Sequence, residues 1–241
     1  MKTFYELQEG LQDPNIFKAF FLAGGPGSGK SYVAMRSTGG SGLKTINSDD
    51  AFEHLLKKAG MSLKIPPPSA GGKKDFDPEK DKEYKRYMGV RGRAKEITAA
   101  KKGNYLEGRI GLVIDGTGRE ADKILKQKAS LEELGYDTYM IFVNTSLDTA
   151  LQRNADRPRS VPEPIVVKSW KDVQANIGKF SNMFRGGFIV VDNNDAGEDI
   201  FKEVSKRVRG LLRKKVTNTR ARNWVSMEMK RRGITKAPKG F

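Results

Sequence analysis

The chain has 241 residues, of which 37% are hydrophobic and 31% charged, and its formal net charge is +16. It contains no cysteine, which excludes disulfides and thiolate–metal sites and favours a reducing compartment. No apolar run approaches the roughly 20 residues that span a membrane, and residues 1–15 lack the apolar core of a signal peptide. We therefore expect a soluble, cytoplasmic protein with no membrane partner.

Short apolar runs alternate with longer amphipathic stretches, a pattern typical of α/β folds with a parallel sheet. The apolar runs predict strands at 19–22, 43–46, 112–114, 139–143 and 188–191. Helices are predicted after residue 30, at 50–59, 91–102, 120–134, 146–155 and 169–184, and from about 202. Because the strands are too apolar to leave one face in water, we expect a three-layer α/β sandwich with a five-stranded, mostly parallel sheet.

Two segments depart from this alternation. Residues 62–89 combine a run of three consecutive prolines, a glycine pair and dense mixed charge, which predicts an exposed loop inserted at about 62–90. It is open whether this loop is an acceptor lid or a spacer. After Val216 the basic sequence predicts a loosely structured tail, with a short helix at NWVSMEMKRR as the alternative.

The positive charge is concentrated at the C-terminal end. Residues 206–241 contain thirteen Lys or Arg and one acid, Glu228, a net charge of +12, so the other 205 residues share the remaining +4. We therefore divide the chain into an N-terminal extension (1–16), a central α/β domain (17–205) and a basic C-terminal extension (206–241).

The sequence GGPGSGKS at 24–31 follows the first predicted strand and opens the first helix. It fits the pattern G-x-x-x-x-G-K-[ST], in which glycine backbone amides curl around phosphate oxygens at a helix N-terminus. The lysine reaches the β- and γ-phosphates and the serine hydroxyl binds Mg²⁺, so ATP or GTP with Mg²⁺ is expected. The candidate nucleotide-binding residues are Gly25, Gly27, Ser28, Gly29, Lys30, Ser31 and Tyr32.

With this phosphate loop, the expected sandwich is a P-loop NTPase fold. Residues beyond the loop indicate which class of P-loop protein the chain resembles. A GTPase usually carries N-K-x-D, but the nearest segment here, NTSLD at 144–148, has no lysine. A motor ATPase usually carries Asp-Glu after a central strand, but here Asp115 is followed by Gly116. A small kinase needs a carboxylate near the acceptor hydroxyl and arginines on a lid. Candidates for both are present, so the sequence favours a kinase.

Carboxylates follow two predicted strands at the edge where open α/β sheets bind ligands. Asp49 and Asp50 follow the second strand, and either could accept a hydroxyl proton, although Asp50 could also cap a helix. Asp115, Thr117 and Arg119 follow the third strand. This loop could hold Mg²⁺ through water and bind acceptor groups, or be an ordinary turn.

Three arginines lie close together in LQRNADRPRS, at 151–160. They could close over the γ-phosphate and neutralise charge in the transition state, or form a solvated helix end. Arg153 and Arg159 are stronger candidates than Arg157. At the end of the last strand, Asn193 is a candidate for base recognition, and the single histidine, His54, is expected at the surface or in helix packing.

Taken in order, LAGGPGSGKS, NSDDAF and LVIDGTGRE resemble the zeta-toxin family of P-loop kinases, over about Phe17 to Asn194. The resemblance implies that Asp50 is the catalytic base and that Asp115, Thr117 and Arg119 bind acceptor groups. It also places Glu96, in RAKEI, in the acceptor pocket. Arg153 and Arg159 resemble the lid arginines of the family.

The related polynucleotide 5′-kinases share many of these parts, and their N-x-D-D motif would make Asp49 the base. We favour Asp50 because the Gly-Thr-Gly-Arg element is more zeta-like. The chain also resembles kinase-like proteins of large tailed phages, and no antitoxin partner is evident.

Two functions are therefore weighed. The first is ATP- or GTP-dependent phosphorylation of a hydroxyl on a nucleotide sugar, a nucleotide or a nucleic-acid 5′-end. The second is a nucleotide-gated protein with weak or no kinase activity that docks on nucleic acid or an assembly through its tail. Cations of the tail could bind phosphate backbones while Trp224 stacks on a base, or the tail could merely be solvated. We favour the kinase because a base and lid arginines accompany the phosphate loop.

Overall fold

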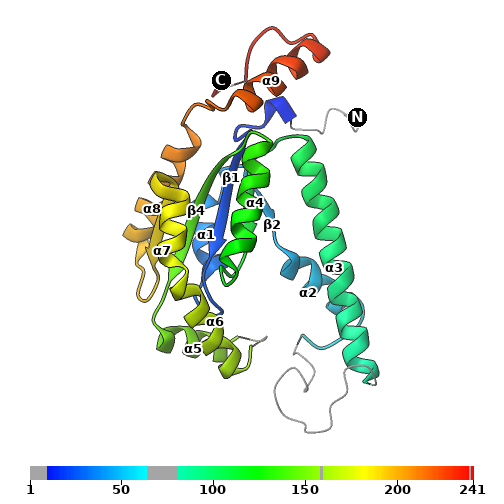
Figure 1. Cartoon of the computed structure of the whole chain (residues 1–241). Coiled ribbons are helices and arrows are strands. Elements are labelled where there is room, and N and C mark those ends of the chain that lie inside the picture. The colour runs from blue at the N-terminus through cyan, green and yellow to red at the C-terminus, as the bar shows by residue number, and fades with distance from the viewer. Residues whose placement is uncertain (1–9, 64–80, 158–159, 239) are drawn as a thin grey trace.

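The computed structural model describes residues 10–63, 81–157, 160–238 and 240–241. Its centre is a five-stranded sheet in the order β2-β3-β1-β4-β5, in which every neighbouring pair is parallel (Figure 1). The predicted fold class is therefore confirmed. The strands are β1 (Lys18–Ala23), β2 (Lys44–Ile46), β3 (Leu112–Asp115), β4 (Asp137–Asn144) and β5 (Phe188–Asp192).

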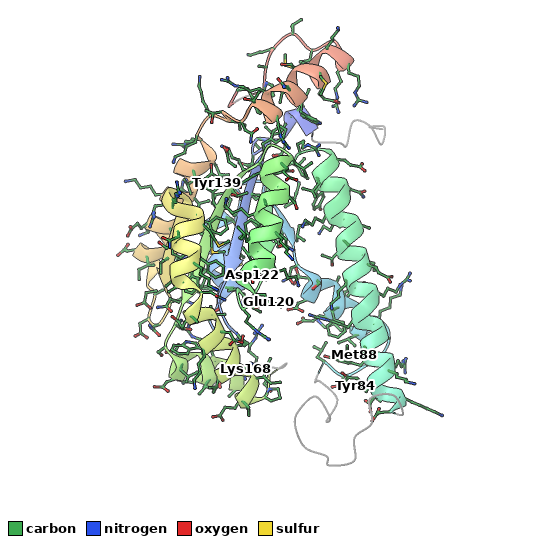
Figure 2. All side chains as sticks on the ribbon, viewed as in Figure 1. Tyr84, Met88, Glu120, Asp122, Tyr139 and Lys168 are labelled. Atoms are coloured by element: carbon green, nitrogen blue, oxygen red, sulfur yellow. The ribbon has the colours of Figure 1, made fainter. Side chains whose placement is uncertain are left out.

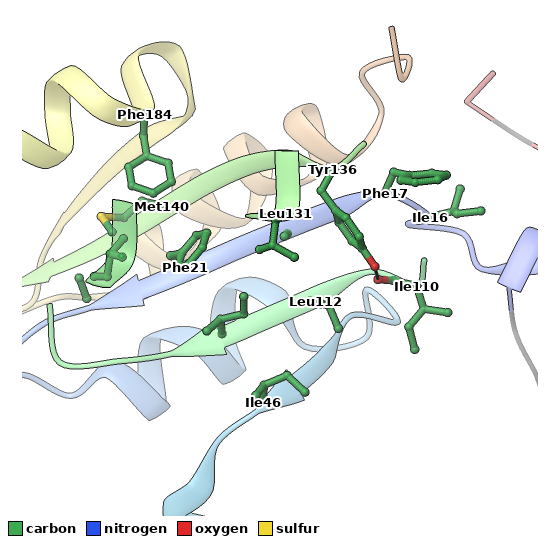
Figure 3. Packing of buried hydrophobic residues seen from close by; sticks show 14 of the residues in the cluster. Ile16, Phe17, Phe21, Ile46, Ile110, Leu112, Leu131, Tyr136, Met140 and Phe184 are labelled. Atoms are coloured by element: carbon green, nitrogen blue, oxygen red, sulfur yellow. Dashed lines mark hydrogen bonds between the residues drawn. The ribbon is translucent and has the colours of Figure 1, made fainter. Parts of the chain in front are cut away.

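Both faces of the central strands β1, β3 and β4 are buried along most of their length, as their apolar runs require. Successive side chains of a strand point to opposite faces, and on β1 Phe21 and Ala23 join one hydrophobic cluster while Phe20 and Leu22 join another. The first cluster is shown in Figure 3, where the Tyr136 hydroxyl donates a hydrogen bond of 3.1 Å to the Ile110 carbonyl. The core therefore has two apolar layers, one on each side of β1.

Helices cover these two faces. On one face, α1 and α8 contribute to the second cluster, and on the other face α4, α6, α7 and α9 contribute to the first. The described helices are α1 (Lys30–Thr38), α2 (Ser48–Lys58), α3 (Lys82–Glu107), α4 (Ala121–Glu133), α5 (Leu147–Ala155), α6 (Glu163–Ala175), α7 (Ile177–Phe184), α8 (Glu198–Leu212) and α9 (Thr219–Arg232), with 3-10 turns η1 (Gly10–Gln12) and η3 (Arg185–Gly187).

Helices α2 and α3 form a small unit of their own beside the sheet (Figure 1). Their shared core consists of Phe52 and Leu56 from α2 and Tyr87 and Ala94 from α3. The rings of Phe52 and Tyr87 meet edge to face with centroids 5.0 Å apart. This unit positions the residues after β2, and the C-terminal end of α3 packs against the first main cluster through Tyr105 and Leu106.

Two sequence predictions about helices are corrected by the structure. Helix α3 begins at Lys82 with Asp81 as its N-cap, accepting a hydrogen bond from the Tyr84 amide at 2.8 Å, so residues 82–89 are not a loop. Residues 64–80 of the predicted loop lie outside the described residues. The helix predicted at 169–184 is two helices, α6 and α7, which meet at Asn176.

The prediction of a loosely structured tail is also wrong, because α9 packs on the core. Ala221 and Val225 are buried, and the Trp224 ring meets Phe17 edge to face at 5.5 Å. Phe241 packs on the other side of this contact, 6.0 Å from the Phe17 ring. Trp224 is therefore partly buried against the core, and its suggested role in base stacking stays a prediction. The division of the chain at 16 and 205 stays a prediction.

Among the described residues, no helix combines the length and the apolar character that crossing a membrane requires.

Helix α9 offers a matched pair of substitutions that tests its packing. Trp224→Ala should lower the free energy of unfolding by about 3 kcal/mol, because it removes a ring from the first cluster. Met227→Ala, on the same helix and 65% exposed, should cost less than about 0.5 kcal/mol. Urea unfolding of the two variants measures both values, and equal losses would show that α9 is not docked.

Candidate functional site

The loop between β1 and α1 is packed too closely for side chains. Gly27 and Gly29 have φ angles of +77° and +78°, a conformation that glycine adopts without strain. A Cβ atom on Gly27 would lie 2.0 Å from the Ala150 carbonyl oxygen, and one on Gly29 would lie 2.4 Å from the Asn193 amide nitrogen. The glycines of the motif are therefore required by the loop's neighbours as well as by its curvature.

Residues after β5 hold this loop from behind. The Asn193 side chain donates a 2.8 Å hydrogen bond to the Ser28 carbonyl. The guanidinium of Arg153, in the last turn of α5, donates to the carbonyls of Asn193 and Asn194 at 2.6 and 2.8 Å. These hydrogen bonds join the phosphate loop, the end of α5 and the segment after β5. Asn193 therefore supports the phosphate loop in the structure.

Lys30 opens α1 at the centre of the site. Its ammonium donates a 2.7 Å hydrogen bond to the Gly24 carbonyl. Burial lowers its pKa, and the nearby Asp115 carboxylate opposes that effect. A buried ammonium at a helix N-terminus, beside backbone amides, attracts a multiply charged anion such as a phosphate chain.

The loop opens into a cavity of about 650 Å³ with two chemically different walls. One wall carries the phosphate loop, Tyr32 and two arginines of the α5 end. The other wall carries carboxylates and one arginine from α2 and α3, and the loop after β3 lies between them. The polar residues that line it include Lys30, Ser31, Tyr32, Asn47, Ser48, Asp49, Asp50, Glu53, Arg91, Asp115, Thr117, Arg153 and Arg157.

Asn47 connects the carboxylates that follow β2 and β3. Its Oδ1 accepts from the Asp49 amide at 2.8 Å, which caps α2. Its Nδ2 donates to Asp115 Oδ2 at 3.1 Å and to Asp50 Oδ1 at 3.4 Å. Asn47 was missed as a site residue, although an Asn before Ser-Asp-Asp at a strand end is a recognisable N-cap signal.

The two aspartates of α2 differ in their surroundings. Asp49 forms a 2.5 Å ion pair with Arg91 of α3, and the Arg91 guanidinium lies 4.8 Å from the Phe52 ring centroid. The pKa of Asp50 is raised, first by burial and then by the negative charges of Glu53 and Asp49. Arg91 could not be predicted as a site residue from local pattern, because its pair with Asp49 joins residues 42 positions apart.

Asp115 lies deepest among the carboxylates. Burial raises its pKa, and Lys30 partly opposes the rise. Its Oδ1 is buried and, among the described residues, has no hydrogen-bond partner. The described chain holds no cluster of three His, Cys, Asp or Glu that could bind a metal by itself. Ser31 and Asp115 therefore fit Mg²⁺ that arrives with nucleotide phosphates, which is how this ion is usually held.

Two acceptor-side candidates lie outside the cavity. Glu96 is exposed on α3, and Arg119 pairs with Asp172 at 3.8 Å; neither is among the described residues that line the cavity. His54 is exposed on α2. Arg159 lies outside the described residues. Arg157, the weakest of the three arginines in the sequence analysis, lines the cavity and is close enough to Lys30 to lower the pKa of that lysine.

Comparisons with known proteins agree with this fold. The family model AAA_33, described as an AAA domain, matches residues 20–179. A candidate kinase from Chloroflexus aurantiacus has a similar structure, with a TM-score of 0.51 at 16% identity over 81% of this chain and 98% of that chain. A chain of the AvrRxo1-ORF1:-ORF2 complex with ATP superposes with a TM-score of 0.52 at 14% identity, over 83% of this chain and 70% of that chain. No curated protein matches the sequence.

Gly27 and Gly103 provide a test of the loop geometry. Gly27→Ala should lower the free energy of unfolding by at least about 2 kcal/mol, because its Cβ would overlap a fixed carbonyl. Gly103→Ala, in the exposed interior of α3 with nothing within 4 Å of the new Cβ, should instead raise it by about 0.5–1 kcal/mol. Thermal unfolding with and without Mg-ATP follows both variants. A Gly27→Ala protein with unchanged stability and ATP protection would show that the loop is not tightly held.

Proposed function

The chain belongs to the AAA_33 family, and from that membership and the two-walled cavity we propose that it is an ATP-dependent kinase that phosphorylates a hydroxyl group. One observation carries the proposal: the phosphate loop with Lys30 and the carboxylates after β2 and β3 open into the same cavity. The phosphate loop wall would hold the donor nucleotide, ATP or GTP. The carboxylate wall would hold the acceptor.

The donor side has the groups that phosphoryl transfer needs. Lys30 and the loop amides would bind the β- and γ-phosphates, with Arg157 on the same wall adding positive charge. Ser31 and Asp115 would hold Mg²⁺, which neutralises negative charge that develops on the phosphates. Arg153, bonded to two backbone carbonyls, would support the nucleotide through the loop it stabilises.

The acceptor side favours Asp50 over Asp49 as the base. The Asp49 carboxylate is neutralised by Arg91, which weakens it as a proton acceptor. Asp50 has a raised pKa, which makes its carboxylate a stronger base. Asp50 would accept the proton of the acceptor hydroxyl while that oxygen bonds to the γ-phosphorus and the bond to the β-phosphate oxygen breaks, releasing ADP.

The acceptor class rests on the resemblance to zeta toxins. That resemblance supports a nucleotide sugar, and the related polynucleotide kinases support a nucleotide or a nucleic-acid 5′-end. Thr117 lines the cavity, whereas Glu96 and Arg119 do not. A zeta-like acceptor would therefore be bound mainly through Thr117 and the α2 carboxylates.

Matched aspartate variants test the base assignment. Asp50→Asn should lower transfer from γ-labelled ATP by roughly 10²–10⁴-fold while ATP binding is retained, because the change removes only the proton acceptor. Lys30→Ala should abolish transfer and weaken ATP binding. Asp122→Asn, exposed at the start of α4 (Figure 2), is the control. The assay screens nucleotide sugars, nucleosides and 5′-hydroxyl oligonucleotides.

Two results would change the proposal. Full transfer by Asp50→Asn together with an inactive Asp49→Asn would move the base to Asp49. Hydrolysis of ATP without transfer to any acceptor would instead indicate a nucleotide-gated binding protein.

The pH dependence of transfer gives a second test of Asp50. Because its pKa is raised, the carboxyl stays protonated to a higher pH than an ordinary aspartate, so the acid limb of the rate profile should lie above the usual range near pH 4. Glu53→Gln removes one negative charge that raises this pKa, so it should move the acid limb to lower pH. Glu120→Gln, at the start of α4, should leave the limb in place. A limb that Glu53→Gln does not move would argue against Asp50.

A further inference from the structure

The strongest positive charge on the molecule lies far from the cavity, on the surface formed by α8's last turns, the segment 213–218 and α9. We call the exposed Lys and Arg side chains of residues 206–236 the C-terminal basic surface. The one acid in this range, Glu228, bonds to Arg231 and Arg232 of its own helix. Among the described residues, none of the other cations in this range forms an ion pair. They include Arg209, Arg213, Lys215, Arg222 and Lys230, all exposed.

This surface is fixed on the protein rather than carried by a loose arm. The buried Lys18 ammonium donates a 2.8 Å hydrogen bond to the Lys214 carbonyl. Arg220 donates to the Glu133 carbonyl at 2.8 Å, and Trp224 docks on Phe17. The backbone that carries these cations is thus already ordered before a partner binds. Binding therefore loses little backbone conformational entropy.

We propose that the C-terminal basic surface binds the phosphate backbone of nucleic acid. A dense array of exposed Lys and Arg on a rigid support matches a polyanion, and release of its counterions would drive binding. The apolar side of α9, with Ala221 and Val225, is buried in the core. Its exposed side carries Arg222, Ser226 and Lys230, with Met227 as its large exposed apolar residue. This composition favours nucleic acid over a membrane, which would need an apolar face to insert.

The bound nucleic acid is not the phosphoryl acceptor. Phe17, which holds α9, precedes β1, and the phosphate loop follows it, so six strand residues separate the two sites by about 20 Å. In Figure 2, α9 lies at one end of the molecule, and Glu120 and Lys168 lie toward the other. The surface therefore anchors the protein on nucleic acid while the cavity acts on another molecule.

Charge reversal on the outer side of α9 tests this anchor. Arg222→Glu/Lys230→Glu should weaken binding to a fluorescein-labelled DNA duplex by at least about tenfold and reduce the slope of log affinity against log salt by about two. Neither residue touches the core clusters. Deleting the segment after residue 215 is a poorer test, because it removes Trp224 and Phe241 from the Phe17 contact. Fluorescence anisotropy over a salt series measures both quantities.

The matched control is Lys126→Glu/Lys179→Glu, which makes the same charge change on exposed positions of α4 and α7 and should leave DNA affinity within about twofold, since long-range charge effects are screened. Lys30→Ala and added Mg-ATP should also leave it unchanged. Equal losses in both charge-reversed proteins, competition by ATP, or binding to phosphatidylserine vesicles but not to DNA would overturn the proposal. If the α9 variant melts early, Arg222→Gln/Lys230→Gln replaces it, and unchanged DNA affinity in that protein is equally decisive.

Discussion

The site depends on a close approach between the phosphate loop and the backbone around it. Only glycine fits at 27 and 29, because the Ala150 carbonyl and the Asn193 side chain occupy the space of a Cβ. That contact requires α5 and the segment after β5 to stay where they are, and Arg153 holds them by bonding to the carbonyls of Asn193 and Asn194. A loop packed in this way keeps its amides oriented without the binding energy of a ligand, which is the arrangement that favours electrostatic catalysis.

Strand β1 connects the two ends of the molecule. Its side chains pack into both apolar layers, so the strand has little freedom to shift. At its carboxyl end it carries the phosphate loop, and at its amino end Phe17 receives Trp224 and Phe241. Lys18 adds a buried ion pair with Asp137 at 2.7 Å. One rigid element therefore supports both the nucleotide site and the C-terminal helix.

The features that could be predicted from sequence are those encoded by local pattern. The strands follow from apolar runs, and the phosphate loop follows from its glycines, lysine and serine. Contacts between distant segments could not be predicted: Arg91 meets Asp49 across 42 positions, and Asn47 meets Asp115 across 68. Family resemblance pointed to Glu96 on α3, but the residue of that helix that lines the cavity is Arg91, more than one turn earlier. The prediction of a loose tail is wrong because a few apolar side chains, among them Ala221, Trp224 and Val225, dock α9. They are spaced among many charged residues, so the segment has no long apolar run.

Arg91 also explains how adjacent aspartates can take different roles. Two carboxylates at neighbouring positions repel each other, and each would raise the pKa of the other. The guanidinium beside Asp49 compensates one of them, and its stacking on Phe52 holds it on that side. Asp50 is left with repulsion from Glu53 and Asp49, which raises its affinity for a proton. Under the proposed function, the small core of α2 and α3 would therefore decide which of the two carboxylates is the stronger base.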